Sequence, residues 1–310
     1  MIVKVHELVK KYGDVVAVDK VDLEINEGEI YGLLGPNGAG KTTFINIICD
    51  MVKRNSGELY LFDEKIDKSI QHLKKDIGVV PQTIAIYEDL TASENVAFFA
   101  SLYGIKGDLL NERVKEALEF VGLSDHSKTY PKTFSGGMKR RLNIACAIAH
   151  HPRLVIMDEP TVGIDPQSRN HILNSVKKLN QLGSTIIYTS HYMEEVEQIC
   201  TRIGILDHGK VIAEGTKEEL QSIVTDRKTI KIKIGYDQVL DTRLLKDVKG
   251  VMCIAENANI LTVECQKESD CISEVMAILL KKHIKVIDIQ MESVSLESAF
   301  LSLTGRRLRD

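Results

Sequence analysis

The sequence predicts an α/β fold in which a mostly parallel sheet carries an antiparallel β subdomain and an inserted helical subdomain, followed by a small α+β domain. Two observations lead to this prediction. Short, almost wholly apolar runs at residues 30–34, 154–158 and 185–190 alternate with helix-like stretches, the pattern of a buried parallel sheet. After about residue 225 the pattern restarts, so we expect two domains, residues 1–224 and 225–310.

The chain opens with strands. IVKVHELV and VVAVDKVDLEI alternate as half-buried strands do, and they predict the antiparallel β subdomain. After a turn at NEGE, the run IYGLL predicts a buried strand that leads into GPNGAGKTT and then into the helical pattern FINIICDMV. Another buried strand, IGVVP at residues 77–81, ends at Pro81.

The stretch from about residue 84 to 150 predicts a helical subdomain. Its first helix begins with a capping box formed by Thr91 and Glu94, and NERVKEALEFVGL has the apolar spacing of a second helix. Strands then return as LVIMD and TIIYTS, separated by a helix near 170–182. RIGILDHGKVIAEG predicts a hairpin that turns at His208-Gly209.

The C-terminal region predicts the order β-α-β-β-α-β, which is that of a small ferredoxin-like domain. TIKIKIGY, VMCIAE, NILTVEC and KVIDIQ supply the strands, with a turn expected at Glu256-Asn257, and LDTRLLKDV supplies the first helix. Apolar residues from Ile272 to Leu280 follow the spacing of one helix face. SLESAFLSL predicts a closing helix.

Composition narrows the class of protein. The 310 residues carry a formal net charge of −4, which argues against a general nucleic-acid binder, and 44% hydrophobic residues are enough for substantial cores. The longest apolar runs, NIACAIA and VMAILL, are far below the ~20 residues of a membrane span. Without a CxxC pair, the cysteines predict buried free thiols rather than zinc ligands, an iron–sulfur site or a disulfide framework. They are Cys49, Cys146, Cys200, Cys253, Cys265 and Cys271.

The stretch GPNGAGKT satisfies the phosphate-loop pattern GxxxxGK[ST] and lies between a predicted strand and a predicted helix, as that motif requires. Glycines let main-chain N–H groups wrap the phosphates, Lys41 supplies a cation, and the Thr42 hydroxyl can bind Mg²⁺. The core is therefore predicted to be a P-loop NTPase. The candidate nucleotide-binding residues here are Gly35, Pro36, Asn37, Gly38, Ala39, Gly40, Lys41, Thr42 and Thr43.

A buried strand that ends in two carboxylates, LVIMDEP, complements this loop. Asp158 can lie beside the metal ion, and Glu159 can face a water aligned for attack on the γ-phosphate, because successive residues diverge at a strand end. These residues predict a nucleotide hydrolase. No NKxD-type guanine-reading motif is present, which favours ATP.

A second candidate anion site lies at FSGGMKRR, where Ser135, Gly136 and Gly137 precede a predicted helix. One chain that holds one Mg-nucleotide has no internal use for a second phosphate loop. Two copies related by a two-fold axis resolve this, because each copy can close its SGG helix over the phosphate held by the other. The cations Lys139, Arg140 and Arg141 that follow are interpreted as a solvated helix face, with contact to an anion or a partner as the alternative.

GPNGAGKTT, FSGGMKRR, LVIMDEP, Gln82 and His191 resemble, in this order, the nucleotide-binding subunit of ABC transporters over about residues 2–220. The resemblance implies roles by position. Tyr12 would stack on adenine, Gln82 would contact Mg²⁺ and water and report to a transmembrane partner, Asp165 would link the two sites, and His191 would contact the γ-phosphate. It also implies a homodimer or heterodimer of ATPase subunits bound to polytopic permease subunits at the cytoplasmic face of the membrane.

Two features narrow the resemblance. Met138 stands where the family's signature commonly has glutamine, and Val162 opens VGID in place of the more familiar SALD. Both variants, together with the C-terminal domain, are similar to those of the ATPase subunits of type 2 exporters, including drug, antibiotic and polysaccharide efflux systems. We therefore expect an exporter in which Glu159 activates water. The alternatives are a non-transport ATPase that acts on ribosomes or DNA, and an importer subunit.

Overall fold

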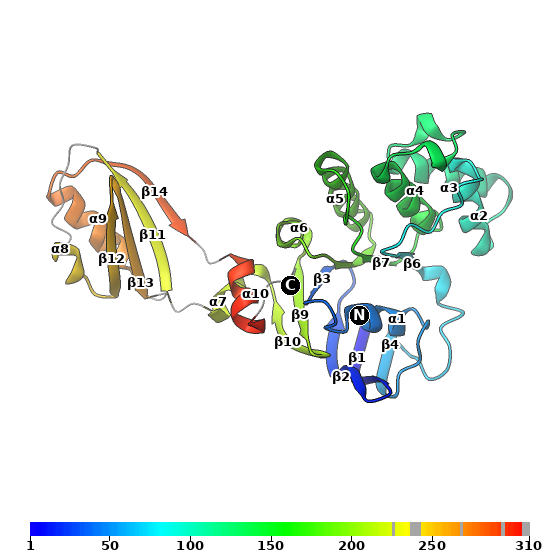
Figure 1. Ribbon diagram of the computed structural model, residues 1–310, viewed down its shortest axis with the longest axis horizontal. Helices are drawn as coiled ribbons and strands as arrows, with labels where there is room; N and C mark the ends of the chain where they lie inside the picture. The colour runs from blue at the N-terminus through cyan, green and yellow to red at the C-terminus, as the bar shows by residue number, and fades with distance from the viewer. Residues whose placement is uncertain (225–226, 236–242, 267–268, 293–294, 306–310) are drawn as a thin grey trace. The chain divides into compact units, whose positions relative to one another are not determined.

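The computed structural model describes residues 1–224, 227–235, 243–266, 269–292 and 295–305 (Figure 1). These residues form two compact units. The larger unit contains residues 1–217 with Thr304 and Gly305, and the smaller unit contains residues 218–303. No helix in these described ranges is long and apolar enough to cross a membrane.

The larger unit is built on a six-stranded sheet in the order β10-β9-β3-β8-β7-β6. Five neighbouring strands are parallel, and only β10 runs antiparallel, to β9. This is the mostly parallel sheet that the sequence predicts. The strands are β3 (Ile30–Leu34), β6 (Ile77–Val80), β7 (Leu154–Asp158), β8 (Thr185–Thr189), β9 (Arg202–Asp207) and β10 (Lys210–Gly215).

Strand β7 explains why these runs are apolar throughout. Val155 and Met157 belong to one hydrophobic core, whereas Leu154 and Ile156 belong to another on the opposite face of the sheet. Because side chains alternate along a strand, a strand covered on both faces needs an apolar residue at every position. All five residues of β7 are buried.

A four-stranded antiparallel sheet in the order β2-β1-β4-β5 shares a hydrophobic core with α1 and one face of the large sheet. The first two strands follow the predicted alternation. SGELYL and the two residues of β5 were not predicted as strands, because their apolar content is low: β4 is identified by its pairing with β1, and β5, whose two residues are exposed, by its pairing with β4. The elements are β1 (Val3–Tyr12), β2 (Val15–Ile25), α1 (Lys41–Ile48), β4 (Ser56–Leu61) and β5 (Glu64–Lys65).

The helical subdomain packs on the other face of the sheet, where α2, α3 and α4 contact one another (Figure 1). The predicted capping box is present: the Thr91 hydroxyl accepts from the Glu94 backbone N–H, and the Glu94 carboxylate accepts from that of Thr91. Helix α5 begins earlier than predicted, because Asp165 caps it. The helices of the larger unit, with its single-turn 3₁₀ segments, are η1 (Lys74–Asp76), α2 (Ala92–Leu102), α3 (Gly107–Phe120), η2 (Ser124–His126), η3 (Pro131–Thr133), α4 (Gly136–Ile148), α5 (Pro166–Gln181) and α6 (Met193–Ile199).

The smaller unit has the predicted β-α-β-β-α-β order, and its antiparallel sheet runs β12-β13-β11-β14. The hairpin turns at Ala258-Asn259 rather than at the predicted Glu256-Asn257, since Ala258 adopts a positive φ of 54° and Asn257 still pairs with Ile260. The remaining elements of the chain are α7 (Lys217–Val224), β11 (Arg227–Ile234), α8 (Arg243–Lys246), β12 (Val251–Asn257), β13 (Ile260–Gln266), α9 (Cys271–Lys281), β14 (Val286–Glu292) and α10 (Leu296–Thr304).

The expectation that all six cysteines are free thiols is wrong for one pair. Cys265 at the end of β13 and Cys271 at the start of α9 form a disulfide, with their Cα atoms 6.5 Å apart. Both side chains lie in the core of the smaller unit, which brings together two elements that the sequence alone leaves separate. The other four cysteines are free.

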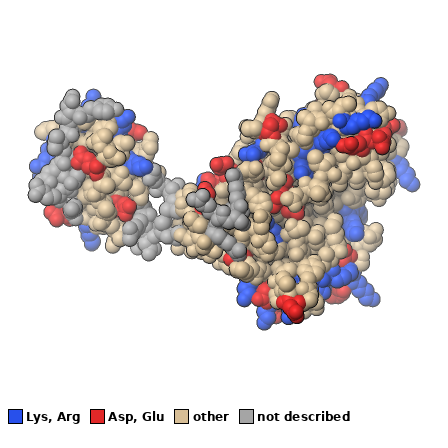
Figure 2. Space-filling view, viewed as in Figure 1, with Lys and Arg blue, Asp and Glu red and all other residues tan. Residues whose placement is uncertain are grey.

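Charged side chains of both signs are interspersed over the face of the larger unit seen in Figure 2. Several ion pairs on the surface of the larger unit are short-range or cross-strand, such as Lys4 with Glu24 and Arg113 with Glu116. Exposed pairs of this kind contribute little to stability. The charges that matter for function are the few that are buried.

Candidate functional site

The carboxyl ends of the parallel strands place the candidate residues at one edge of the sheet, where ligands bind in open α/β folds. The phosphate loop follows β3, Gln82 follows β6, Asp158 and Glu159 end β7, and His191 follows β8. A cavity of about 240 Å³ lies among them. It is lined by Ala17, Asn37, Gly38, Ala39, Gly40, Lys41, Thr42, Thr43, Gln82, Glu159 and His191.

The phosphate loop requires its glycines for steric reasons. A Cβ atom on Gly35 would lie 2.2 Å from the Leu206 carbonyl oxygen, and one on Gly40 would lie 2.2 Å from the Ala17 carbonyl oxygen. Gly40 also adopts a φ of 107° and precedes α1 without a side-chain cap. The first N–H groups of α1 are therefore left for an anion, which the helix dipole also favours.

Lys41 supplies the positive charge of the cavity. Its side chain is buried, and its ammonium donates to the carbonyl oxygens of Gly35 at 2.6 Å and Pro36 at 3.1 Å. Burial lowers the pKa of Lys41, and the neighbouring Glu159 and Asp158 oppose this change. A phosphate in the cavity would supply the negative charge that a desolvated ammonium lacks.

Thr42 and Asp158 provide oxygen atoms suited to a hard cation. The Thr42 hydroxyl lies 3.4 Å from one carboxylate oxygen of Asp158, and the Thr189 hydroxyl donates to the other at 2.6 Å. Thr189 also accepts from the Glu159 backbone N–H at 2.9 Å, so it fixes both acids. No cluster of three or more His, Cys, Asp or Glu exists within the described ranges, so a metal here would take further ligands from phosphate and water.

Glu159 lies at the end of the cavity between two polar side chains. The Gln82 amide donates to one of its carboxylate oxygens at 2.8 Å, and Nε2 of His191 contacts the other. Glu159 is 7% exposed and adopts a positive φ of 48°, which turns it away from the strand direction. The cavity therefore ends at a buried carboxylate that is contacted on both oxygens.

The other predicted nucleotide contacts do not line this cavity. Ser135 caps α4, where its hydroxyl accepts from the Met138 N–H at 3.2 Å, and Asp165 caps α5. The backbone N–H of Ser168 lowers the pKa of Asp165. Gly137 packs against α5, and Tyr12 lies half exposed at the end of the first hairpin beneath the Lys10 ammonium. One chain therefore does not bring all of the predicted nucleotide contacts to one cavity.

The solvated-face interpretation of the cations after the SGG loop is wrong for two of them. Arg140 is buried and donates to the backbone carbonyls of Pro81 and Gln82. Arg141 is partly buried and donates to two carbonyls after α3. Sequence reasoning also missed Thr189. Its place at the end of a parallel strand was a usable signal, whereas nothing local indicated the role of Arg140.

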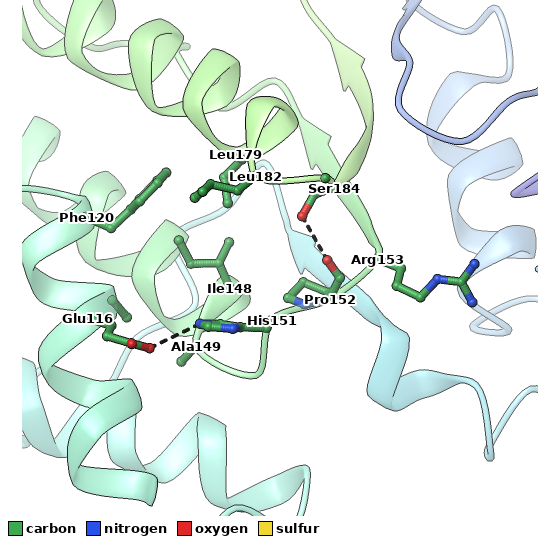
Figure 3. Close-up of a pocket in the computed structure, with 12 residues that line it drawn as sticks. Glu116, Phe120, Ile148, Ala149, His151, Pro152, Arg153, Leu179, Leu182 and Ser184 are labelled. Carbon is green, nitrogen blue, oxygen red and sulfur yellow. Dashed lines mark hydrogen bonds and ion pairs between the residues drawn. The ribbon is translucent and has the colours of Figure 1, made fainter.

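A larger cavity of about 470 Å³ lies elsewhere on the larger unit, between α3, the α4–β7 connection and the end of α5 (Figure 3). Phe120, Ile148, Leu179 and Leu182 give it a mainly apolar lining, and a contact between His151 and Glu116 crosses one side. None of its lining residues belongs to the phosphate loop, so this cavity is separate from the candidate site.

Comparison with known proteins decides the family. The family model described as ABC transporter matches residues 18–162. A linearmycin resistance ATP-binding protein, LnrL of Bacillus subtilis, is 44% identical over 97% of both chains. The chain belongs to the ATP-binding subunits of ABC transporters. The daunorubicin/doxorubicin resistance ATP-binding protein DrrA of Streptomyces peucetius is 34% identical over 98% of this chain and 92% of its own.

A solved ABC cassette has the same core. The dimeric structure of the cassette MJ0796, in a post-hydrolysis state with ADP and Pi, aligns with a TM-score of 0.63 and 32% identity. The alignment covers 69% of this chain and 98% of that one. The P-loop fold and the ATPase class predicted for this ABC subunit are confirmed.

Proposed function

We propose that this chain is the ATP-hydrolysing subunit of an ABC exporter, bound through a separate permease to the cytoplasmic face of the membrane. The observation that carries the catalytic part is the pair of contacts on Glu159, from Gln82 and His191, at the end of a cavity that begins at the phosphate loop. Export is supported by the relatives, whose names describe antibiotic resistance and whose lengths this chain matches.

In this proposal, Lys41 and the N–H groups at the start of α1 bind the β- and γ-phosphates of ATP. Thr42 and Asp158 would hold Mg²⁺. Gln82 would also contribute once its side-chain amide no longer donates to Glu159. The bound Mg²⁺ supplies charge neutralisation on the phosphates. Glu159 accepts a proton from the attacking water, and His191 orients the carboxylate and meets the γ-phosphate.

Ser135, Gly136, Gly137 and Asp165 would act on the nucleotide of a second copy. Their absence from the lining of this chain's own cavity supports a head-to-tail dimer in which each SGG loop completes the other site. ATP then favours the closed dimer through contacts that exist only in that state. Tyr12 would stack on adenine from its exposed position on the first hairpin.

The test is Glu159→Gln in the purified chain. The amide keeps the shape of the side chain and one acceptor oxygen but cannot accept the proton, so we expect kcat to fall about 10²- to 10⁴-fold while ATP binding persists. Size-exclusion chromatography with light scattering should show a dimer that persists in ATP. Glu194→Gln, the same change at an exposed position on α6, is the matched control and should keep full turnover. Full ATPase activity in Glu159→Gln would contradict the assigned base.

A further inference from the structure

Arg140 is a buried cation that has no role in the mechanism proposed above. It lies on α4, is 3% exposed, and has no carboxylate partner within the described part of the chain. Its guanidinium donates to the Pro81 carbonyl at 2.7 Å and to the Gln82 carbonyl. Burying a charge without a counter-ion is unfavourable. The two hydrogen bonds to consecutive backbone carbonyls, one of them that of Gln82, compensate for the loss of hydration of the guanidinium.

Two further contacts join α4 to the same segment. Asn143, three residues after Arg140 and on the same face of α4, accepts from the Ala85 backbone N–H at 2.9 Å. Lys139 forms an ion pair with Glu88. Residues 81–88 belong to no helix or strand, and these hydrogen bonds and this ion pair connect the segment to α4 at several points. We therefore expect the backbone of Gln82 to move together with α4.

The same helix begins at the SGG loop. Ser135 caps α4, and Arg140 lies five positions further on. At the other end of the connection, the Gln82 amide donates to Glu159 at 2.8 Å. A continuous path thus runs from Ser135 through α4 and Arg140 to Gln82 and then to the carboxylate of Glu159.

We propose that Arg140 is a positioning residue that ties Gln82 to the SGG helix, so that the Gln82–Glu159 contact in one site depends on how the helix sits on the other site's nucleotide. This inference rests on the proposed head-to-tail dimer, in which Ser135 serves the partner's ATP and Gln82 serves the chain's own. A shift of α4 on the partner's phosphate then moves Gln82 in this chain. Misplacement by ~1 Å near reacting groups is enough to lower a rate about 100-fold.

The first experiment is Arg140→Met, with Arg141→Met as the matched control. Arg141 is the next residue of α4 and also donates to two backbone carbonyls, but those belong to Val121 and Gly122. We expect Arg140→Met to lower kcat about tenfold or more with KM for ATP nearly unchanged, and Arg140→Lys to recover part of it. Arg141→Met should lower the melting temperature without this loss of kcat.

The second experiment separates the two sites within one dimer. Heterodimers are assembled from differently tagged copies, with Glu159→Gln on one copy so that only the other copy's site turns over. Arg140→Met is placed either on the copy with intact Glu159 or on the copy with Glu159→Gln. Every dimer contains the same substitutions, so a folding defect affects both arrangements equally.

We expect turnover to fall about tenfold only when Arg140→Met lies on the copy with intact Glu159, because Arg140 acts on its own chain's Gln82. Equal loss in both arrangements, loss confined to the opposite arrangement, or no loss in either would overturn the proposal. Failure of the proposed function is distinguishable, because it would appear as absent turnover or absent dimers when Arg140 is intact.

Discussion

At the scale of single residues, the larger unit holds an ionisable side chain in a tightly packed environment outside the nucleotide cavity. His150 lies just beyond α4, at the opposite end of that helix from the SGG loop, and its side chain is partly buried. Its ring stacks on Tyr103 with centroids 3.6 Å apart, and Nε2 lies 3.1 Å from the Ile77 carbonyl oxygen. Nδ1 is buried without a partner. This environment suits only the neutral imidazole.

His150 should make stability depend on pH. Burial lowers its pKa to about 4, against the weaker opposing effect of the Ile77 carbonyl. Between about pH 6.5 and 4, His150 is protonated in the unfolded chain but neutral in the folded chain. The free energy of unfolding therefore falls as pH falls. Between pH 7.5 and pH 5 this residue should account for about 2 kcal/mol.

His150→Phe keeps the stacking on Tyr103 but cannot titrate. Urea unfolding at pH 7.5 and pH 5 should therefore show a smaller loss of stability in this variant than in the parent chain, by the amount given above. His208→Phe, at a side chain that is 82% exposed, controls for loss of a histidine. Identical pH dependence in the parent and His150→Phe would mean that His150 is not the group responsible.

At the scale of elements, the N-termini of α4 and α5 approach each other at Gly137. A Cβ atom there would lie 2.2 Å from Oγ and 2.5 Å from Cβ of Ser168 on α5. Rotating the serine hydroxyl relieves only the first contact, so α4 would have to move. The glycine therefore sets how closely the SGG helix lies to the helix that Asp165 caps.

Gly137→Ala should destabilise the larger unit by about 1–3 kcal/mol, the usual effect of overpacking a close contact. Gly136→Ala is the control, because its Cβ would find only Ile164 at 4.0 Å. Ser168→Gly should recover part of the loss when combined with Gly137→Ala, and a double-mutant cycle measured by thermal unfolding gives the coupling. Additive effects of the two substitutions would show that the helices do not touch there.

At the scale of the whole molecule, an apolar patch on the helical subdomain offers a surface for the permease. Tyr87 and Phe98 meet edge to face at 5.0 Å, and Leu102 lies one turn further along α2. These side chains are 50%, 38% and 65% exposed. Asn95 ties the segment after Gln82 to α2, since it exchanges two hydrogen bonds of 2.8 Å with the Tyr87 backbone. A permease bound here would contact the segment that carries Gln82.

Leu102→Glu should weaken attachment to the permease about tenfold or more, because a charge would enter an apolar contact. The measurement is the amount of integral membrane protein that co-purifies with the tagged chain from native membranes. Leu182→Glu introduces the same charge at a leucine that is 71% exposed directly after α5 and should leave recovery unchanged. Equal recovery with both variants would exclude this patch, and association with ribosomes or DNA would overturn export itself.

Much of the core could be predicted because its signals are local. The phosphate loop is eight consecutive residues that form a recognisable pattern, with positive φ at Gly38 and Gly40, and the strand LVIMD is largely apolar because both of its faces are covered. The capping box of α2 likewise needs only Thr91 and Glu94. Such features follow from short-range sterics and periodicity, which the sequence contains in full.

The family pattern added the order of the motifs, and with it the expectation that Gln82, Glu159 and His191 belong together. The contact between Gln82 and Glu159, by contrast, joins residues 77 positions apart and depends on which strands become neighbours in the sheet. Strand β4 was missed for the same reason, because it is specified by its pairing with β1 and β5 rather than by its own composition.

The motifs of this ABC subunit and the alternation of its core strands and helices could be read from the residues alone. The folded chain was needed to show that Arg140 is buried against the backbone of Gln82, that Arg141 contacts a different segment, and that Cys265 bonds to Cys271. Adjacent cations look alike in a sequence because local patterning specifies a side chain's helix face only approximately. The partner of a long side chain is set by the distant backbone that packs against it, and that packing exists only once the chain has folded.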